Sequence, residues 1–237
     1  MDDRVVLWDF DGTLAERPGG LEGCVHDTLI EAELDIVVSI QEIHSQLRCG
    51  FPWHHPHIPH PELVTRRQWW ETYTPVLTRI FCNIGLSPHQ ARALSESTRV
   101  RFVDPQYWRL FEDALPVLGA LQSQGWRHVV LSNHVPELED IAKALGLQDA
   151  IDAIVNSACT GYEKPHPHAF ELARQAAGEP DVLWMVGDNP DLDVRGAEAA
   201  GIPGILVRYR GSVDSSIRHR ADDLYGVAGL LAEQTGN

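Results

Sequence analysis

The sequence predicts an α/β protein in which a doubly wound parallel sheet carries an inserted all-helical domain. Along most of the second half of the 237-residue chain, short apolar runs alternate with segments of helical periodicity. This alternation is typical of parallel strands joined by right-handed helical crossovers. It fails after the first apolar run, where a mainly helical stretch from Leu21 to about Trp108 is too long for a simple crossover. A helical domain inserted after the first strand accounts for both observations.

Five apolar runs are predicted to form buried parallel strands. In chain order they are Val5–Trp8, His128–Leu131, Ala153–Val155, Val182–Val186 and Ile205–Val207. The helical patterns between the later runs are Glu112–Ser123, Glu137–Leu145, Pro167–Ala176 and Val194–Ala200. Glycines follow three of these helical segments, at the position where a left-handed residue commonly ends a helix. The segment Ala221–Gln234 is expected to form a last short strand or turn and a closing helix.

The inserted segment divides the chain into two units. We expect an α/β core made of residues 1–15 and 109–237, and a helical domain made of residues 16–108. The candidate helices of the inserted domain are Thr28–Leu47, Thr65–Ile84 and Pro88–Arg101. The segment Phe51–Leu63 contains four prolines, which exclude a regular helix or a central strand, so it is predicted to be a loop.

Composition and charge restrict the classes of function. Hydrophobic residues make up 43% of the chain and charged residues 22%, which is ordinary for a globular protein. The net charge of −15 argues against a nucleic-acid partner, because such binding rewards basic surfaces. No apolar run approaches the ~20 residues that cross a bilayer, and no secretory signal is visible. A cytoplasmic protein with four reduced, structural cysteines is therefore expected.

Residues capable of chemistry follow the predicted strands, at the carboxyl ends where ligands bind in open α/β sheets. Asp9 and Asp11 leave the first strand together, because side chains two apart on an extended chain share a face. The others are Ser132 and Asn133 after the second strand, Lys164 after the third, and Asp188–Asp193 after the fourth. Paired carboxylates, a hydroxyl, a lysine and a further acidic cluster together indicate phosphoryl transfer through an aspartate nucleophile.

Each of these residues also has a purely structural explanation. An aspartate such as Asp9 at a strand end is a common turn former, Ser132 can cap the next helix, and Lys164 can be a surface lysine. Their convergence at one edge of the sheet favours the functional interpretation.

Four motifs resemble those of the haloacid dehalogenase superfamily, in the branch that carries a helical cap after the first strand. They are DFDGT at Asp9–Thr13, LSN at Leu131–Asn133, GYEKPHP at Gly161–Pro167 and GDNPDLD at Gly187–Asp193. One short acidic motif arises easily by chance, whereas four in order, each after an apolar run, are a specific signal. The resemblance covers the whole core and implies a Rossmann-like fold in which the inserted domain is the cap.

The resemblance implies roles for the two carboxylates of the first motif. Asp9 is expected to be the nucleophile that attacks phosphorus and forms an aspartyl-phosphate, which water can hydrolyse. Asp11 is expected to protonate the leaving oxygen and then to activate water, as a general acid and base. Superfamily members that release halide lack this second carboxylate, because halide leaves without a proton. Asp11 therefore indicates phosphatase or phosphomutase chemistry.

The resemblance also implies residues that bind phosphate. Ser132 is expected to hydrogen-bond a phosphoryl oxygen, with Asn133 as a further candidate in the same region. Thr13 is expected to steady the first loop of the phosphate site. Lys164 is expected to neutralise the charge of the nucleophile and of the transferring phosphoryl group, which makes it the third catalytic residue.

Mg²⁺ is the cofactor that the resemblance implies. Its expected ligands are the carboxylates of Asp9 and Asp188 and the backbone carbonyl of Asp11, because magnesium prefers a few hard oxygen ligands. Asp193 is expected to support the site by orienting either Lys164 or a water at the metal. Asp191 does not match the register of the motif and is interpreted as a helix cap.

The loop Phe51–Leu63 is rich in histidine as well as in proline. Three interpretations of its histidines remain open: solvent exposure, a contribution to substrate choice at the mouth of the site, and a transition-metal site. The absence of a carboxylate or cysteine at a recognised spacing argues against the metal. These histidines are His54, His55, His57 and His60. Three nearby aromatic residues at helical spacing are predicted to be core of the cap: Trp69, Trp70 and Tyr73.

The leading hypothesis is a magnesium-dependent phosphatase that hydrolyses a small phosphomonoester through an aspartyl-phosphate. The expected partner is a small phosphorylated metabolite, with neither nucleic acid nor membrane. A phosphomutase or phosphotransferase would use the same residues, with an acceptor hydroxyl in place of water. A non-catalytic binding protein of this fold is disfavoured, because all the expected catalytic positions are filled. A dinucleotide-dependent dehydrogenase is weaker again, because no GxGxxG follows the first strand.

Overall fold

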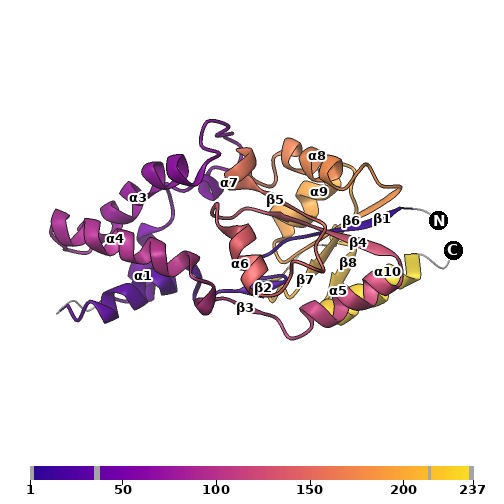
Figure 1. The fold of residues 1–237 in the computed structure, drawn as a ribbon, viewed down its shortest axis with the longest axis horizontal. Helices are drawn as coiled ribbons and strands as arrows, with labels where there is room; N and C mark the ends of the chain where they lie inside the picture. The colour runs from indigo at the N-terminus through magenta and orange to yellow at the C-terminus, as the bar shows by residue number, and fades with distance from the viewer. Residues whose placement is uncertain (1–2, 35–37, 213–214, 235–237) are drawn as a thin grey trace.

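A parallel sheet of six strands forms the centre of the core (Figure 1). The structure is a computed structural model that describes residues 3–34, 38–212 and 215–234. The strand order is β5–β4–β1–β6–β7–β8, so the chain winds outward on both sides of its first strand. The strands are β1 Arg4–Trp8, β4 Trp126–Ser132, β5 Ala153–Asn156, β6 Val182–Gly187, β7 Gly204–Val207 and β8 His219–Ala221. The predicted strands and the doubly wound α/β fold are confirmed.

Helices cover both faces of the sheet, because its strands are apolar on both faces. Val5 and Leu7 of β1 pack with residues of α8 and α9, whereas Val6 and Trp8 pack with residues of α5, α6 and α10. Figure 1 shows α8 and α9 on one side of the sheet and α5 and α10 on the other. The helices are α5 Ala114–Ser123, α6 Leu138–Ala144, α7 Ser157–Thr160, α8 Pro167–Ala176, α9 Gly196–Ala199 and α10 Leu224–Gln234.

The inserted segment forms a helical cap at one end of the molecule (Figure 1). Its helices are α1 Gly20–Glu31, α2 Ile40–Gln46, α3 Arg66–Asn83 and α4 Pro88–Val103. The predicted loop Phe51–Leu63 lies between α2 and α3 and contains one short 3₁₀ turn, Pro52–His54. None of the helices in the described ranges is both long enough and apolar enough to span a membrane.

The prediction of one continuous helix over Thr28–Leu47 is wrong. The first cap helix, α1, ends at Glu31, and α2 begins only after Ser39. The hydroxyl of Ser39 accepts a 3.2 Å hydrogen bond from the backbone N–H of Glu42, whose carboxylate accepts a 2.8 Å bond from the N–H of Ser39. This reciprocal capping box starts a new helix. Residues 35–37 of the predicted helix lie outside the described residues.

The cap is joined to the core by a two-stranded antiparallel sheet of β2 Ala15–Glu16 and β3 Arg109–Leu110. This sheet lies where the sequence predicts the change from core to cap, and the predicted division at residues 15–16 and 108–109 stays a prediction. A second contact joins α3 to α6, where Nε1 of Trp70 donates to the carboxylate of Glu137 at 3.1 Å. The cap therefore contacts the core at more than its stem.

Asp113 ties together segments that are far apart in the chain. It directly precedes α5, its carboxylate is paired with Arg208 after β7, and it accepts a 2.8 Å hydrogen bond from the backbone N–H of Leu224 in α10. Asp113 is only 6% exposed, so water does not readily replace these partners.

Asp113→Ala is expected to lower the free energy of unfolding by about 3 kcal/mol, because it leaves a half-buried guanidinium and a backbone N–H without their partner. Urea unfolding followed by circular dichroism measures this change. Glu71→Ala is the matched control, because it breaks an exposed ion pair with Arg67, and its expected cost is below about 1 kcal/mol. Equal losses in the two variants would contradict this account of the core.

Candidate active site

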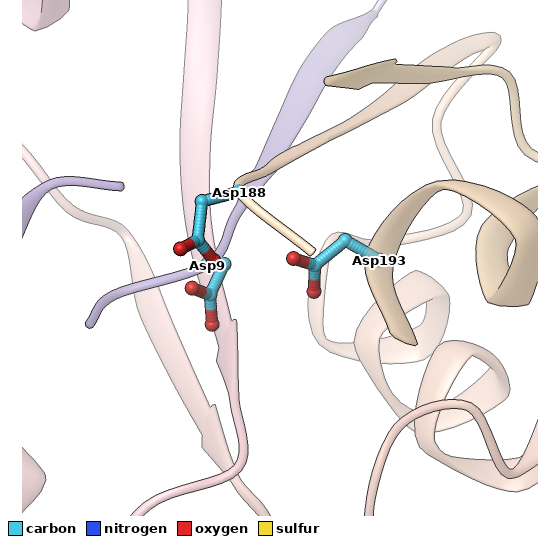
Figure 2. Close-up of side chains that lie close together, drawn as sticks. All are labelled: Asp9, Asp188 and Asp193. Carbon is cyan, nitrogen blue, oxygen red and sulfur yellow. The ribbon is translucent and has the colours of Figure 1, made fainter. Parts of the chain in front are cut away.

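The carboxyl ends of β1, β4 and β6 meet at one edge of the sheet and bring predicted motif residues together. Asp9 directly follows β1, Ser132 is the last residue of β4, and Asp188 directly follows β6. Strand pairing sets this arrangement, because β1 pairs with β4 on one side and with β6 on the other. Figure 2 shows the carboxylates of Asp9, Asp188 and Asp193 turned toward one another.

Lys164 lies within this cluster and is only 2% exposed. Its Nζ lies 2.7 Å from Oδ1 of Asp9 and 2.6 Å from Oδ1 of Asp193. Burial by itself would lower the pKa of Lys164, but the charges of Asp193 and Asp9 outweigh burial and raise the pKa above its ordinary value. Lys164 is therefore a fixed cation at neutral pH.

Asn133 holds the backbone of Lys164 in place. Its Nδ2 donates to the carbonyl of Lys164 at 2.8 Å, and its Oδ1 accepts from the N–H of Lys164 at 2.6 Å. Both ends of the amide are thus engaged by the lysine loop. This geometry favours a positioning role for Asn133, and direct contact with phosphate stays a prediction.

Two buried hydroxyls hold the carboxylate of Asp9. Oγ of Ser132 donates to Oδ1 of Asp9 at 3.2 Å, and Oγ1 of Thr13 donates to Oδ2 at 3.4 Å. Together with Lys164, these groups contact both oxygens of the carboxylate. The carboxylate of Asp9 is therefore fixed in position by three neighbouring side chains.

Asp193 supports Lys164 on the side away from Asp9. While Oδ1 of Asp193 contacts the ammonium, its Oδ2 accepts a 2.9 Å hydrogen bond from the backbone N–H of Asn189. Burial, opposed in part by the charge of Lys164, raises the pKa of Asp193 to about 6. The carboxylate is therefore mostly ionised at neutral pH and pairs with the lysine.

In place of the predicted helix Val194–Ala200, the structure has two short elements. The first is a π-helical segment, Pro190–Arg195, which carries Asp193, and the second is the short helix α9. Asn189 caps this segment, because its Oδ1 accepts 3.0 Å hydrogen bonds from two successive backbone N–H groups. The interpretation of Asp191 as the cap is wrong, and its exposed side chain pairs with an arginine one turn later.

The carboxylates fit a divalent cation. Oxygens of Asp9, Asp188 and Asp193 lie within 4.8 Å of one another, and such hard oxygen donors suit Mg²⁺. Both oxygens of Asp193 accept bonds, from Lys164 and from the backbone N–H of Asn189. The choice of Asp9 and Asp188 as the metal ligands stays a prediction. The backbone carbonyl of Asp11 as a further ligand stays a prediction.

Asp188 occupies space that only a glycine leaves open. A Cβ at Gly12 would lie 2.4 Å from Oδ2 of Asp188, and Gly12 has a φ of +88°, which favours glycine. Burial, and then the charge of Asp9, raises the pKa of Asp188 to about 7. A cation at this carboxylate would relieve the repulsion that raises its pKa.

Asp11 lines a cavity between cap and core, and its side chain is exposed. The cleft walls remove part of its hydration, and this burial, followed by the charges of Asp9 and Glu16, raises the pKa of Asp11 to about 7. A carboxyl group that titrates near neutral pH can both give and accept a proton.

Comparison with known proteins places the chain in a family. The sequence pattern of the haloacid dehalogenase-like hydrolases matches residues 4–201. The chain belongs to the haloacid dehalogenase-like hydrolases.

Relatives of this hydrolase include a named phosphatase. The chain is 27% identical, over 91% of its length and 86% of the relative's, to haloacid dehalogenase-like hydrolase domain-containing protein 3 of Bos taurus. It is 28% identical, over 87% of its length and 80% of the relative's, to phosphoglycolate phosphatase of Rhodospirillum rubrum. The solved structure of the HAD-hydrolase YfnB of Bacillus subtilis, bound to magnesium, shares the fold. The two structures superpose with a TM-score of 0.72 at 17% sequence identity, and the match covers 98% of this chain and 99% of the YfnB chain.

The structure brings one histidine of the loop Phe51–Leu63 to the core of this hydrolase. His60 is 5% exposed, and its Nε2 lies 3.2 Å from Oε1 of Glu163. Its backbone N–H donates to the carbonyl of Gly161 at 2.8 Å. Gly161 permits this contact, because a Cβ there would lie 2.6 Å from Cα of the next loop residue, Pro61. The loop therefore docks on the segment that carries Lys164.

Solvent exposure is confirmed for His55 and His57 of the same loop. Within the described ranges, the group of side chains placed to hold a metal contains none of the loop's histidines. The predicted aromatic core of the cap is confirmed, because Trp69, Trp70 and Tyr73 are all buried.

Sequence reasoning missed His134, which directly follows the LSN motif. It is 4% exposed, and its ring packs against Phe10, Phe102 and Trp108 at centroid distances of 5.6, 6.2 and 5.0 Å. Burial lowers its pKa to about 4, so the ring is neutral at neutral pH. The sequence feature that could have drawn attention to His134 is its position immediately after Asn133, at the end of a strand in the centre of the sheet.

Asp188→Asn is expected to stabilise the metal-free hydrolase at pH 8. The pKa of Asp188 in the folded state, about 7, exceeds the value of about 4 in an unfolded chain, so folding favours the protonated form. The stability gained from protonation is present below about pH 4 and is lost as the pH rises through about 7. The free energy of unfolding of the variant should therefore exceed that of the wild type by about 2 kcal/mol at pH 8 and by much less at pH 5. Partial hydration of the site keeps the difference at pH 8 to this size.

Urea unfolding at both pH values, with chelator present, measures this difference. Asp191→Asn is the matched control, because it removes an exposed carboxylate of the neighbouring segment. A stability difference for Asp188→Asn that does not change with pH would contradict the raised pKa.

Proposed function

We propose that this hydrolase is a magnesium-dependent phosphatase that hydrolyses a small phosphomonoester through an aspartyl-phosphate. The observation that carries the proposal is the placement of Asp9, which contacts Lys164 and Ser132 and lies beside Asp188. A nucleophile, a cation and oxygen ligands for a metal thus stand at one point of the cleft. Similarity to the phosphoglycolate phosphatase of Rhodospirillum rubrum supports phosphoryl rather than halide chemistry.

In the first step, an oxygen of Asp9 attacks phosphorus, and a new O–P bond forms as the P–O bond to the leaving group breaks. Asp11 is partly protonated at neutral pH, because its pKa is about 7, and it gives its proton to the leaving oxygen. In the second step, Asp11 accepts a proton from the water that attacks the aspartyl-phosphate at phosphorus. Inorganic phosphate leaves, and both carboxyl groups return to their starting states.

Fixed charges balance the charge of the transferring group, which is the main demand of phosphoryl transfer. Lys164 and Ser132 lie against the oxygen of Asp9 that faces them, and Asn133 and Asp193 hold the lysine there. When bound by Asp9 and Asp188, Mg²⁺ supplies a further positive charge that neutralises and orients phosphate oxygens.

The cap completes the proposed site. We take residues 16–108 as the cap, with the sheet of β2 and β3 as its stem and the contact of His60 with Glu163 as a second attachment. A cap docked in this way excludes bulk water while it leaves room for the water that completes the reaction.

Asp9→Asn is expected to lower phosphate release by about 10⁴-fold or more, because an amide is a poor nucleophile and a poor metal ligand. The assay measures inorganic phosphate from a panel of phosphorylated metabolites and an aryl phosphate, with Mg²⁺ or with chelator. Asp191→Asn, which changes an exposed carboxylate, is the control and should behave like the wild type.

Turnover by Asp9→Asn at the wild-type rate would rule out this nucleophile. Release of the alcohol without an equal amount of phosphate, when an acceptor such as glycerol is present, would identify a phosphotransferase instead.

Asp11→Asn is expected to slow the release of the alcohol from alkyl phosphates in the first turnover by about 10²–10⁴-fold, and the release of 4-nitrophenolate much less, because nitrophenolate leaves without a proton. Rapid-quench measurement of the alcohol released in a single turnover isolates this step from the second step, in which Asp11 also acts and which both esters share. Equal losses of this first-turnover rate on both esters would show that Asp11 does not protonate the leaving group.

A further inference from the structure

We infer that the site selects a phosphomonoester whose leaving group carries no negative charge and presents an apolar face to Trp53. The inference rests on the proposed phosphatase function and concerns the substrate class of that site. It also assigns a role to the histidine-rich loop, which carries Trp53.

A cavity of about 260 Å³ adjoins Asp11 at the junction of cap and core. Because Asp11 is the proposed acid for the leaving oxygen, this cavity lies on the leaving-group side of the phosphate. Its volume is below the ~300 Å³ at which pockets for drug-sized ligands begin, so it fits a small leaving group. The apolar residues of its lining are Leu21, Trp53, Phe102 and Val135.

Trp53 is a firmly held wall of this cavity. Its ring stacks on Phe51 at a centroid distance of 4.7 Å, with the planes within 2° of parallel, and lies 6.0 Å from the ring of Trp69. Farther along, the same loop is fixed to the core through His60 and Gly161. A ring held at both ends of its loop can offer contact area at little cost in conformational entropy.

The charged residues that line the cavity, Asp11 and Glu22, are both acidic. Arg17 is not part of the lining: its side chain is 2% exposed, contacts Asp27 at 3.5 Å and donates to the carbonyl of Gly20 at 2.9 Å. Asp11 is protonated when it acts as the proposed acid, so a carboxylate on the leaving group would meet the like charge of Glu22, with no cation of the described lining to pair with it.

The histidines near the mouth add no cation to the described lining. His44 is exposed and lies outside the lining, with its Nδ1 3.1 Å from the carboxylate of Glu22. Burial, and then the neighbouring His55, lowers the pKa of His54. His134 in the cavity wall is neutral, because burial lowers its pKa to about 4.

The test compares two esters of equal size that differ only in charge: 2-phosphoglycolate and its primary amide. With Mg²⁺ at pH 7.5, the wild type is expected to hydrolyse the amide with a kcat/KM at least about tenfold higher. Glu22→Lys is expected to reduce this preference by about tenfold, because a cation then faces the carboxylate. Glu62→Lys makes the same change of charge on the exposed part of the loop and should leave the preference unchanged.

A second pair of variants tests the apolar wall with benzyl phosphate as the substrate. Trp53→Ala is expected to lower kcat/KM by about tenfold, mainly through KM, because the loss is one of binding. Ile58→Ala removes a large apolar side chain that is 65% exposed on the same loop, and should have no such effect.

The outcomes separate this inference from the proposed function. Hydrolysis of 2-phosphoglycolate as fast as its amide, or equal effects of Trp53→Ala and Ile58→Ala, would overturn the inference and leave the phosphatase standing. Hydrolysis of none of these esters by the folded, magnesium-loaded wild type would overturn both.

Discussion

The rest of the site depends on the two ion pairs of the buried Lys164 ammonium. A charge at this depth is tolerable only with opposite charges in contact, and Asp9 and Asp193 provide them at 2.7 and 2.6 Å. Three separate parts of the chain must therefore be placed correctly at once: the end of β1, the loop after β5, and the π-helical segment after β6. The parallel sheet achieves this, because it aligns the carboxyl ends of its strands.

The core and the cap divide the work of the site. The charges proposed to serve phosphoryl transfer come from the core, whereas the cap contributes Trp53 and Phe102 to the cavity beside Asp11. The loop that carries Trp53 also docks through His60 on the segment of Lys164. The loop that carries Trp53 and the segment that carries Lys164 thus meet at one contact between cap and core.

The sequence predicted the sheet and the meeting of its motif residues because both depend on local patterns. Buried strands are recognisable as apolar runs, and parallel strands carry their carboxyl ends to one edge. The contact of His60 with Glu163 could not be predicted, because these residues are 103 positions apart and their pairing depends on how the cap docks. The split of the predicted helix over residues 28–47 did have a local signal, the capping box of Ser39 and Glu42, which the helical pattern on both sides obscured.

The central claim is that Asp9 carries the phosphoryl group during turnover. The most direct test mixes an excess of magnesium-loaded enzyme rapidly with a substrate, quenches the reaction with acid at successive times, and locates phosphate by peptide mass spectrometry. The expected result is a transient, hydroxylamine-sensitive phosphoryl group on Asp9 that rises before inorganic phosphate appears and then decays. Phosphate on a different residue, or complete release of product with the protein unmodified at every time, would contradict it.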